Sequence, residues 1–203
     1  LMLIRRFFIF QPIPQIHLFS VRINRMNTLP NIFLIGLMGA GKTTIGKQLA
    51  VELKRPFYDS DHVISERTGV SIPTIFELEG EEGFRLREMA TLDELTAQSE
   101  IVLATGGGAV IREANRQCLK QRGIVLYLHA LPHILLERTR SDKNRPLLQV
   151  DNPLAKLQEL YDIRDPIYRA TAHHIIDANQ GSCQKTIQHI LQLLTQRNSA
   201  CKP

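Results

Sequence analysis

The segment GLMGAGKT at residues 36–43 constrains this chain most, because it fits the phosphate-binding pattern G-x-x-x-x-G-K-[ST] at every fixed position. Its three glycines allow a tight turn in which successive backbone N–H groups converge on phosphate oxygens. In this pattern the lysine, here Lys42, reaches the β- and γ-phosphates of a nucleotide, and the Thr43 hydroxyl ligates Mg²⁺. A glycine-rich turn without a ligand is the alternative, but such a turn has no need of Lys-Thr after its last glycine.

The residues on either side of this loop fit a strand that leads into a helix. Residues 31–35 (NIFLI) read as a buried strand, and residues 42–53 read as a helix with Ile45, Leu49 and Leu53 on one face. Such a helix points the partial positive charge of its N-terminus at the phosphates. The sequence therefore predicts a strand–loop–helix unit that binds a nucleotide.

Short apolar segments alternate with amphipathic ones along the rest of the chain. Further strands are predicted at 56–58, 101–104, 124–128 and 175–176. Helices are predicted at 62–67, 72–78, 81–98, 132–139, 153–164 and 182–197. This alternation is typical of an α/β fold, in which helices cover both faces of a parallel sheet.

Composition narrows the class of protein. A length of 203 residues with 43% hydrophobic content fits one domain with a sizeable core. The three cysteines, Cys118, Cys183 and Cys201, are widely separated and form no C-x-x-C pair. This spacing argues against a structural zinc site or a disulfide framework and suits a reducing cytosol, so we expect a cytoplasmic protein.

The net charge of +5 comes mainly from the first 25 residues, which hold four arginines and no acidic residue. The remaining 21 basic and 20 acidic residues nearly balance, so no nucleic-acid partner is expected.

The apolar runs at 1–4 and 7–10 are too short to span a membrane, and no membrane partner is expected. The lack of acids resembles a transit segment, but a single serine and a Pro-x-Pro break favour an extension without a fold of its own.

Two carboxylates follow the second predicted strand, at the edge of the sheet where ligands of open α/β folds bind. Alternation along an extended backbone would place Asp59 and Asp61 on the same side. The strand at 101–104 leads into Thr105 and supplies no acid, so Asp59 is the best candidate for the Mg²⁺ shell. Asp61 is then free to face a second substrate, unless it only caps the following helix.

Two later segments add weaker indications. The glycines at 106–108 follow a predicted strand, and they could form a hinge or offer backbone N–H groups to an anion or hydroxyl. Arg145 lies in a polar segment between two predicted helices. Such a segment is a natural lid, and an arginine in it could stabilise a transferring phosphate.

Taken together, these pieces resemble the shikimate kinase family. The matching segments are 36–46 (GLMGAGKTTIG), 59–61 (DSD), 80–88 (GEEGFRLRE), 106–110 (GGGAV), 145–148 (RPLL) and 164–168 (RDPIY). They stand in the family's order and spacing from about residue 31 to 197. The phosphate loop alone indicates only a nucleotide-binding protein, whereas the ordered set is highly specific.

The resemblance implies an enzyme that transfers the γ-phosphoryl group of ATP to the 3-hydroxyl of shikimate. This reaction gives shikimate 3-phosphate and ADP on the route to chorismate and the aromatic amino acids. The cofactors would be ATP and Mg²⁺, with the metal held by Thr43 and Asp59. The residues that would contact ATP are Gly39, Ala40, Gly41, Lys42, Thr43, Thr44, Arg138 and Arg145. Arg138 would lie beside the adenine, and Lys42, Asp59 and Arg145 would be catalytic.

On the acceptor side the resemblance implies that Asp61 binds ring hydroxyls of shikimate. Arg85 and Arg164 would clamp the substrate carboxylate, which suits the planar guanidinium fork. Backbone groups of the glycine segment Gly106, Gly107 and Gly108 would also contact the substrate.

The resemblance further implies a P-loop α/β/α sandwich with a five-stranded parallel sheet of order 2-3-1-4-5. The kinase domain would span 30–198, with a substrate-binding segment at about 62–94 and a lid at about 140–152. Residues 1–29 would form an extension that we expect to be disordered, with residues 1–25 dispensable, and 199–203 a short tail. We expect a monomer.

One departure and two alternatives remain. Family members often place an arginine on the adenine just after the fifth strand, where this chain has Gln180. A gluconate kinase-like enzyme would carry His-Pro after the second strand, but here Val63 follows His62. A non-catalytic relative that only binds ligands should have lost Lys42, Asp59, Asp61 or the arginines, and none is missing.

Overall fold

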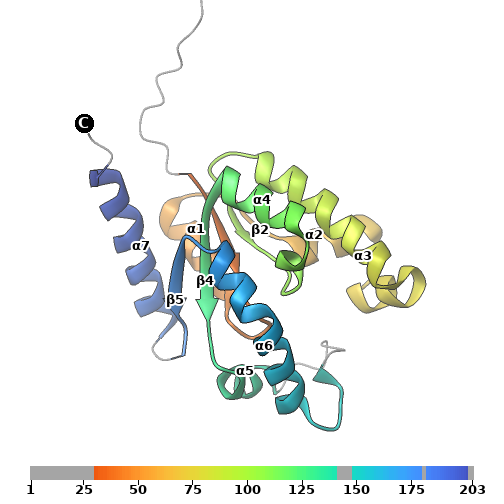
Figure 1. The fold of residues 1–203 in the computed structure, drawn as a ribbon. Coiled ribbons are helices and arrows are strands. Elements are labelled where there is room, and N and C mark those ends of the chain that lie inside the picture. Colours follow the sequence, from red (N-terminus) through yellow and green to blue (C-terminus); the bar gives the residue numbers. More distant parts are fainter. Residues whose placement is uncertain (1–29, 141–147, 180–181, 201–203) are drawn as a thin grey trace, which may run out of the picture.

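A computed structural model describes residues 30–140, 148–179 and 182–200 (Figure 1). The strands are β1 (Asn31–Ile35), β2 (Phe57–Asp59), β3 (Val102–Ala104), β4 (Gly123–His129) and β5 (His174–Asp177). The helices are α1 (Lys42–Leu53), α2 (Ser60–Thr68), α3 (Ile72–Ala97), α4 (Glu113–Arg122), α5 (Pro132–Thr139), α6 (Pro153–Thr171) and α7 (Cys183–Ala200), with a 3₁₀ turn η1 (Ala109–Ile111). Among the described residues, no helix is both long enough and apolar enough to cross a membrane.

The five strands form one sheet of order β2-β3-β1-β4-β5, and all of its paired strands are parallel. The predicted α/β fold and the strand order implied by the family resemblance are therefore confirmed. β1 lies at the centre between β3 and β4, and all five of its residues are buried. Helices cover both faces, because a parallel sheet of apolar strands must be shielded on both sides.

The two helical segments predicted at 72–78 and 81–98 form α3, which is broken at Gly80. This glycine has φ 69° and ψ −176°, a conformation that residues with a side chain rarely adopt. Before and around the break, Ile64, Ile75 and Phe84 form a small apolar cluster of their own, with Ile72 packed against it. The segment from α2 to the first part of α3 thus has its own small core beside the sheet.

The end predicted for the helix at 153–164 is wrong, because α6 continues through Pro166 to Thr171. A proline normally weakens or ends a helix, since it has no N–H donor and crowds the preceding turn. In this helix Tyr168 is fully buried, and its ring stacks on that of Tyr127 in β4 at 4.9 Å. Tertiary packing therefore holds the helix together where the local sequence disfavours it.

Helix α4 was not predicted from the sequence. Its ten residues, EANRQCLKQR, are mostly polar, and only Asn115 and Leu119 are buried. Such a helix lacks the apolar stripe that marks a helix in a sequence. Asn115 instead donates a hydrogen bond to the carbonyl oxygen of Ala109, which ties α4 to η1.

Candidate active site

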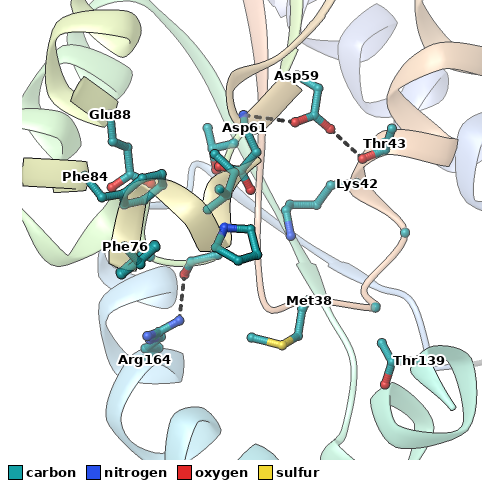
Figure 2. Close-up of a pocket in the computed structure, with 18 of the residues that line it drawn as sticks. Met38, Lys42, Thr43, Asp59, Asp61, Phe76, Phe84, Glu88, Thr139 and Arg164 are labelled. Atoms are coloured by element: carbon teal, nitrogen blue, oxygen red, sulfur yellow. Dashed lines mark hydrogen bonds between the residues drawn. The ribbon is translucent and has the colours of Figure 1, made fainter. Parts of the chain in front are cut away.

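A cavity of about 680 Å³ opens at the carboxyl ends of β1, β2 and β3 (Figure 2). The predicted site residues that line it are Gly39, Gly41, Lys42, Thr43, Thr44, Asp59, Asp61, Arg85, Gly106, Gly107, Gly108, Arg138 and Arg164. Ala40 is not among them, because it is buried beneath the loop as part of the main apolar core. Arg145 and Gln180 lie outside the described residues.

The loop between β1 and α1 has the backbone that the phosphate-binding pattern requires. Gly39 and Gly41 have φ values of 80° and 95°, in the left-handed region that favours glycine. Gly41 is the N-cap of α1, and no side chain there makes a capping hydrogen bond. The helix thus presents an N-terminus whose backbone donors have no side-chain cap, which suits an anion.

Lys42 reaches back over this loop. Its Nζ atom donates hydrogen bonds to the carbonyl oxygens of Gly36 and Leu37, at 2.7 and 2.9 Å. The ammonium group is therefore held across the loop, where its charge can attract the terminal phosphates of a nucleotide.

Thr43 and Asp59 lie side by side at the start of α1 (Figure 2). The Thr43 hydroxyl donates to Asp59 Oδ2 at 2.6 Å. Hydroxyl and carboxylate oxygens are ligands that Mg²⁺ accepts, so this pair fits the metal. No group of three metal-ligating side chains occurs in the described part of the chain, so phosphate oxygens and water would supply the remaining ligands.

The prediction that Asp59 and Asp61 alternate along an extended backbone is wrong. Asp59 ends β2, whereas Asp61 is already in the first turn of α2. The alternative that Asp61 caps this helix is also wrong. Asp59 is the N-cap, and its Oδ1 accepts hydrogen bonds from the backbone N–H groups of Asp61, at 3.2 Å, and His62. These two bonds hold the Asp59 carboxylate in place at the start of α2. Although Asp61 lies in a helix, both carboxylates line the cavity.

The environment of Asp61 is crowded with negative charge. Its Oδ1 atom is buried and has no hydrogen-bond partner within the described chain. Burial, followed by the nearby charges of Asp59 and Glu88, raises the pKa of Asp61 to about 6. A Cβ at Gly106 would lie only 2.6 Å from Asp61 Oδ1 and 2.9 Å from Glu88 Oε1, so only glycine fits between the two carboxylates.

Arg85 is held in place by two carboxylates of its own helix, α3. Its Nη1 donates to Glu88 Oε2 at 2.8 Å, and its Nε and Nη2 donate to Glu81 Oε1 at 3.3 and 3.2 Å. Burial raises the pKa of Glu88, against the opposing effect of Arg85. Burial alone would lower the pKa of Arg85, but Glu88 and Glu81 outweigh it, so the net change is upward. The guanidinium group thus stays charged in a buried position.

Arg164 enters the cavity from α6 (Figure 2). Its Nη1 donates to the carbonyl oxygen of Gly107 at 3.3 Å, and the Tyr168 hydroxyl donates to the same oxygen. Arg85 and Arg164 are each only 8% exposed, and both border the glycine segment. Two buried guanidinium groups in one cavity form a site that suits a carboxylate.

Several residues that line the cavity were not predicted from the sequence: Met38, Ile72, Pro73, Phe76, Phe84, Glu88, Thr105 and Thr139. The rings of Phe76 and Phe84 stack at 4.6 Å and form an apolar wall beside Arg85, whose guanidinium lies 5.4 Å from the centre of the Phe84 ring. Glu88 could have been found, because an acid three residues after Arg85 on a helix lies on the same face. Phe76 has no such indication in the sequence.

Arg138 lies at the far end of the cavity, in the last turn of α5. Its Nη2 donates to the carbonyl oxygen of Ala178 at 2.6 Å. This contact ties α5 to the segment that follows β5, and it places a guanidinium group beyond the phosphate loop.

A phosphate-binding loop with lysine and threonine fills one end of this cavity. The other end holds a buried carboxylate and two buried arginines. This fold and this site define a P-loop kinase that acts on a small molecule.

The sequence model of shikimate kinases matches residues 38–195, and the chain belongs to the shikimate kinase family. Shikimate kinase of Dechloromonas aromatica is 57% identical over 173 residues, which cover 85% of this chain and 94% of that protein. The structure of shikimate kinase from Acinetobacter baumannii in complex with shikimate matches with a TM-score of 0.81 and 57% identity, over 84% of this chain and 95% of that one. Shikimate kinase from Bacteroides thetaiotaomicron matches with a TM-score of 0.77 and 33% identity, over 82% and 98% of the two chains.

Proposed function

We propose that this chain transfers the γ-phosphoryl group of ATP to the 3-hydroxyl of shikimate, with the residues of this cavity in the roles given below. As a member of its family it is an ATP-dependent kinase with an alcohol as acceptor, and it serves aromatic amino acid biosynthesis. The observation that best supports the acceptor is the pair of buried arginines, Arg85 and Arg164, in the cavity that also holds the phosphate loop.

On the nucleotide side, the backbone from Gly39 to Thr44 binds the phosphates, and Lys42 neutralises the β- and γ-phosphates. The Thr43 hydroxyl and the Asp59 carboxylate hold Mg²⁺ directly or through its water shell. When bound, Mg²⁺ reduces the repulsion between the phosphate oxygens and an approaching hydroxyl. Arg138 lies beside the adenine.

On the acceptor side, Arg85 and Arg164 bind the carboxylate of shikimate. The unpartnered Oδ1 of Asp61 accepts a hydrogen bond from a ring hydroxyl, which would satisfy a buried acceptor. The stacked rings of Phe76 and Phe84 pack against the apolar edge of the ring. The glycine segment at 106–108 contributes backbone contacts, since it lines the cavity and glycine carries no side chain of its own.

The chemistry we infer is positioning and charge stabilisation, without a covalent intermediate. Lys42 and the N-terminus of α1 face the charge that develops on the phosphoryl group. Asp59, which accepts from the Thr43 hydroxyl and caps α2 beside Asp61, would help to hold Mg²⁺ and would orient the 3-hydroxyl. Arg145 would approach the phosphates from the proposed lid at 140–152 and exclude water from them.

The remaining features of the family assignment are also proposals. The kinase domain spans 30–198, its substrate-binding segment spans about 62–94, and residues 1–25 are dispensable for catalysis. The protein is a cytoplasmic monomer. Gel filtration coupled to light scattering tests the monomer, and the activity of a chain that starts at Met26 tests whether the extension is dispensable.

The decisive experiment measures ADP release by purified protein with Mg·ATP, with and without shikimate. Shikimate-dependent release is expected, and gluconate at the same concentration should give none. Folded, ATP-binding protein without shikimate-dependent release would refute the proposed reaction. Titration calorimetry of two variants tests which residues bind shikimate. Asp61→Ala and Arg164→Ala should each weaken shikimate binding by about 1.5–3 kcal/mol and leave ATP binding nearly unchanged.

A further inference from the structure

Strand β4 and helix α6 lie side by side (Figure 1), and a polar contact outside the cavity joins them at the part of α6 that supplies Arg164. The Tyr127 hydroxyl donates to Asp165 Oδ1 at 2.8 Å, and Arg169 Nε donates to Asp165 Oδ2 at 2.7 Å. Asp165 is thus satisfied on both oxygens, although its side chain is only 14% exposed. A carboxylate so placed is expensive to bury, so its two partners fix its position closely.

Tyr127 contacts α6 in two ways. Its hydroxyl binds Asp165, and its ring stacks on Tyr168 at 4.9 Å with an interplanar angle of 26°. Asp165 is the immediate neighbour of Arg164, and Tyr168 shares the Gly107 carbonyl oxygen with that arginine. One side chain of β4 therefore touches both Asp165, next to Arg164 in the chain, and Tyr168, one helical turn further on.

The backbone of α6 is weak at this point. Pro166 has no N–H to donate within the helix, and it disfavours the helical conformation of the residue before it, which is Asp165. Side-chain contacts must therefore supply part of the stability that the helix loses at Pro166. Tyr127 makes such contacts to Asp165, just before the proline, and to Tyr168, two residues after it.

We propose that Tyr127 and Asp165 are positioning residues for the reaction, because they set the rotation of α6 that brings Arg164 to Gly107 and the acceptor. Neither side chain lines the cavity. They act through Arg164, so the inference rests on the proposed role of that arginine in binding shikimate.

The test compares two tyrosines of the same interface. Tyr161 in α6 makes a hydrogen bond to His129 of β4, and its length of 2.8 Å equals that between Tyr127 and Asp165. Tyr127→Phe should raise KM for shikimate about three- to tenfold, with kcat and KM for ATP changed less than twofold. Tyr161→Phe removes a hydroxyl that acts on Asp165 only indirectly, through His129, whose Nε2 lies 4.0 Å from Asp165 Oδ1, so it should raise KM for shikimate clearly less than Tyr127→Phe does. Equal effects of the two variants would show only a general loosening of α6 and would overturn the proposal.

A double-mutant cycle tests whether the effect passes through the arginine. In an Arg164→Ala background, Tyr127→Phe should raise KM for shikimate no further, since the group that it positions is gone. Multiplication of the two effects would refute the coupling. Asp165→Ala should resemble Tyr127→Phe, and Asp165→Asn should recover much of the affinity because its amide oxygen can still accept from the Tyr127 hydroxyl. A different result would refute the proposed reaction itself: no shikimate-dependent release of ADP by the unaltered protein.

Discussion

A methyl group at Gly108 should damage shikimate binding without unfolding the protein. The backbone there has φ −96° and ψ −3°, which alanine adopts without strain. A Cβ at this position would lie 2.5 Å from Nη2 and 2.7 Å from Cζ of Arg85, and nearer still to Nη1. Ordinary contact begins at 3.4 Å, so the guanidinium group must retreat by about 1 Å.

The substitution should weaken binding and not unfold the protein, because the flexible Arg85 side chain is the group that moves. Moving it strains the hydrogen bonds to Glu88 and Glu81, and it takes the guanidinium away from the position proposed for the substrate carboxylate. Loss of a charge-assisted hydrogen bond costs about 1.5–3 kcal/mol, which corresponds to a roughly 10- to 150-fold weaker affinity. We therefore expect Gly108→Ala to raise Kd for shikimate by about that factor.

Titration calorimetry with shikimate and with ATP, together with thermal melting, measures this outcome. Kd for ATP should stay within about twofold, because the phosphate loop is untouched. In an Arg85→Ala background, Gly108→Ala should weaken shikimate no further, since the clashing side chain is absent. An unchanged Kd for shikimate, or an equal loss for both ligands, would refute the reasoning.

Three further changes have outcomes that the site predicts. Asp61 has a pKa raised from 3.8 to about 6, so the folded protein binds its proton more tightly and stability falls as pH rises from about 4 to 6. Asp61→Asn should then raise the free energy of unfolding at pH 7.5 by about 3 kcal/mol and make it depend less on pH, while KM for shikimate rises. Urea unfolding at pH 4.5 and 7.5 measures this, and an unchanged pH dependence would contradict the prediction. Lys42→Met should lower kcat by orders of magnitude and leave the melting temperature nearly unchanged, and near-normal turnover would contradict its role. Gly80→Ala forces a side chain into φ 69°, ψ −176°, which should cost about 1–3 kcal/mol of stability; a melting temperature equal to that of the unaltered protein would contradict this.

The nucleotide end of the site could be predicted from the sequence because it is local. The backbone from Gly36 to Thr43 takes the conformation of a phosphate-binding loop, and its pattern is visible in eight consecutive residues. The family resemblance added the strand order and the arginines Arg85 and Arg164.

What could not be predicted depends on contacts between distant parts of the chain. The sequence placed Asp61 on an extended backbone, but the N-cap bonds of Asp59 start α2 there instead. The end of α6 was missed because packing against Tyr127 outweighs the local effect of Pro166. Phe76 faces the cavity only because the break at Gly80 folds α3 against itself, and no short pattern reports that.

The small apolar cluster of Ile64, Ile75 and Phe84 gives the segment from α2 to early α3 a small core of its own, separate from that of the sheet. Three buried side chains stabilise far less than the main core, so this unit should open by local unfolding while the sheet stays intact. Phe84 belongs both to the cluster and to the cavity wall, so a bound acceptor also secures the cluster. Amide exchange in α2 and early α3 should therefore slow with acceptor concentration, and it would report occupancy without any turnover.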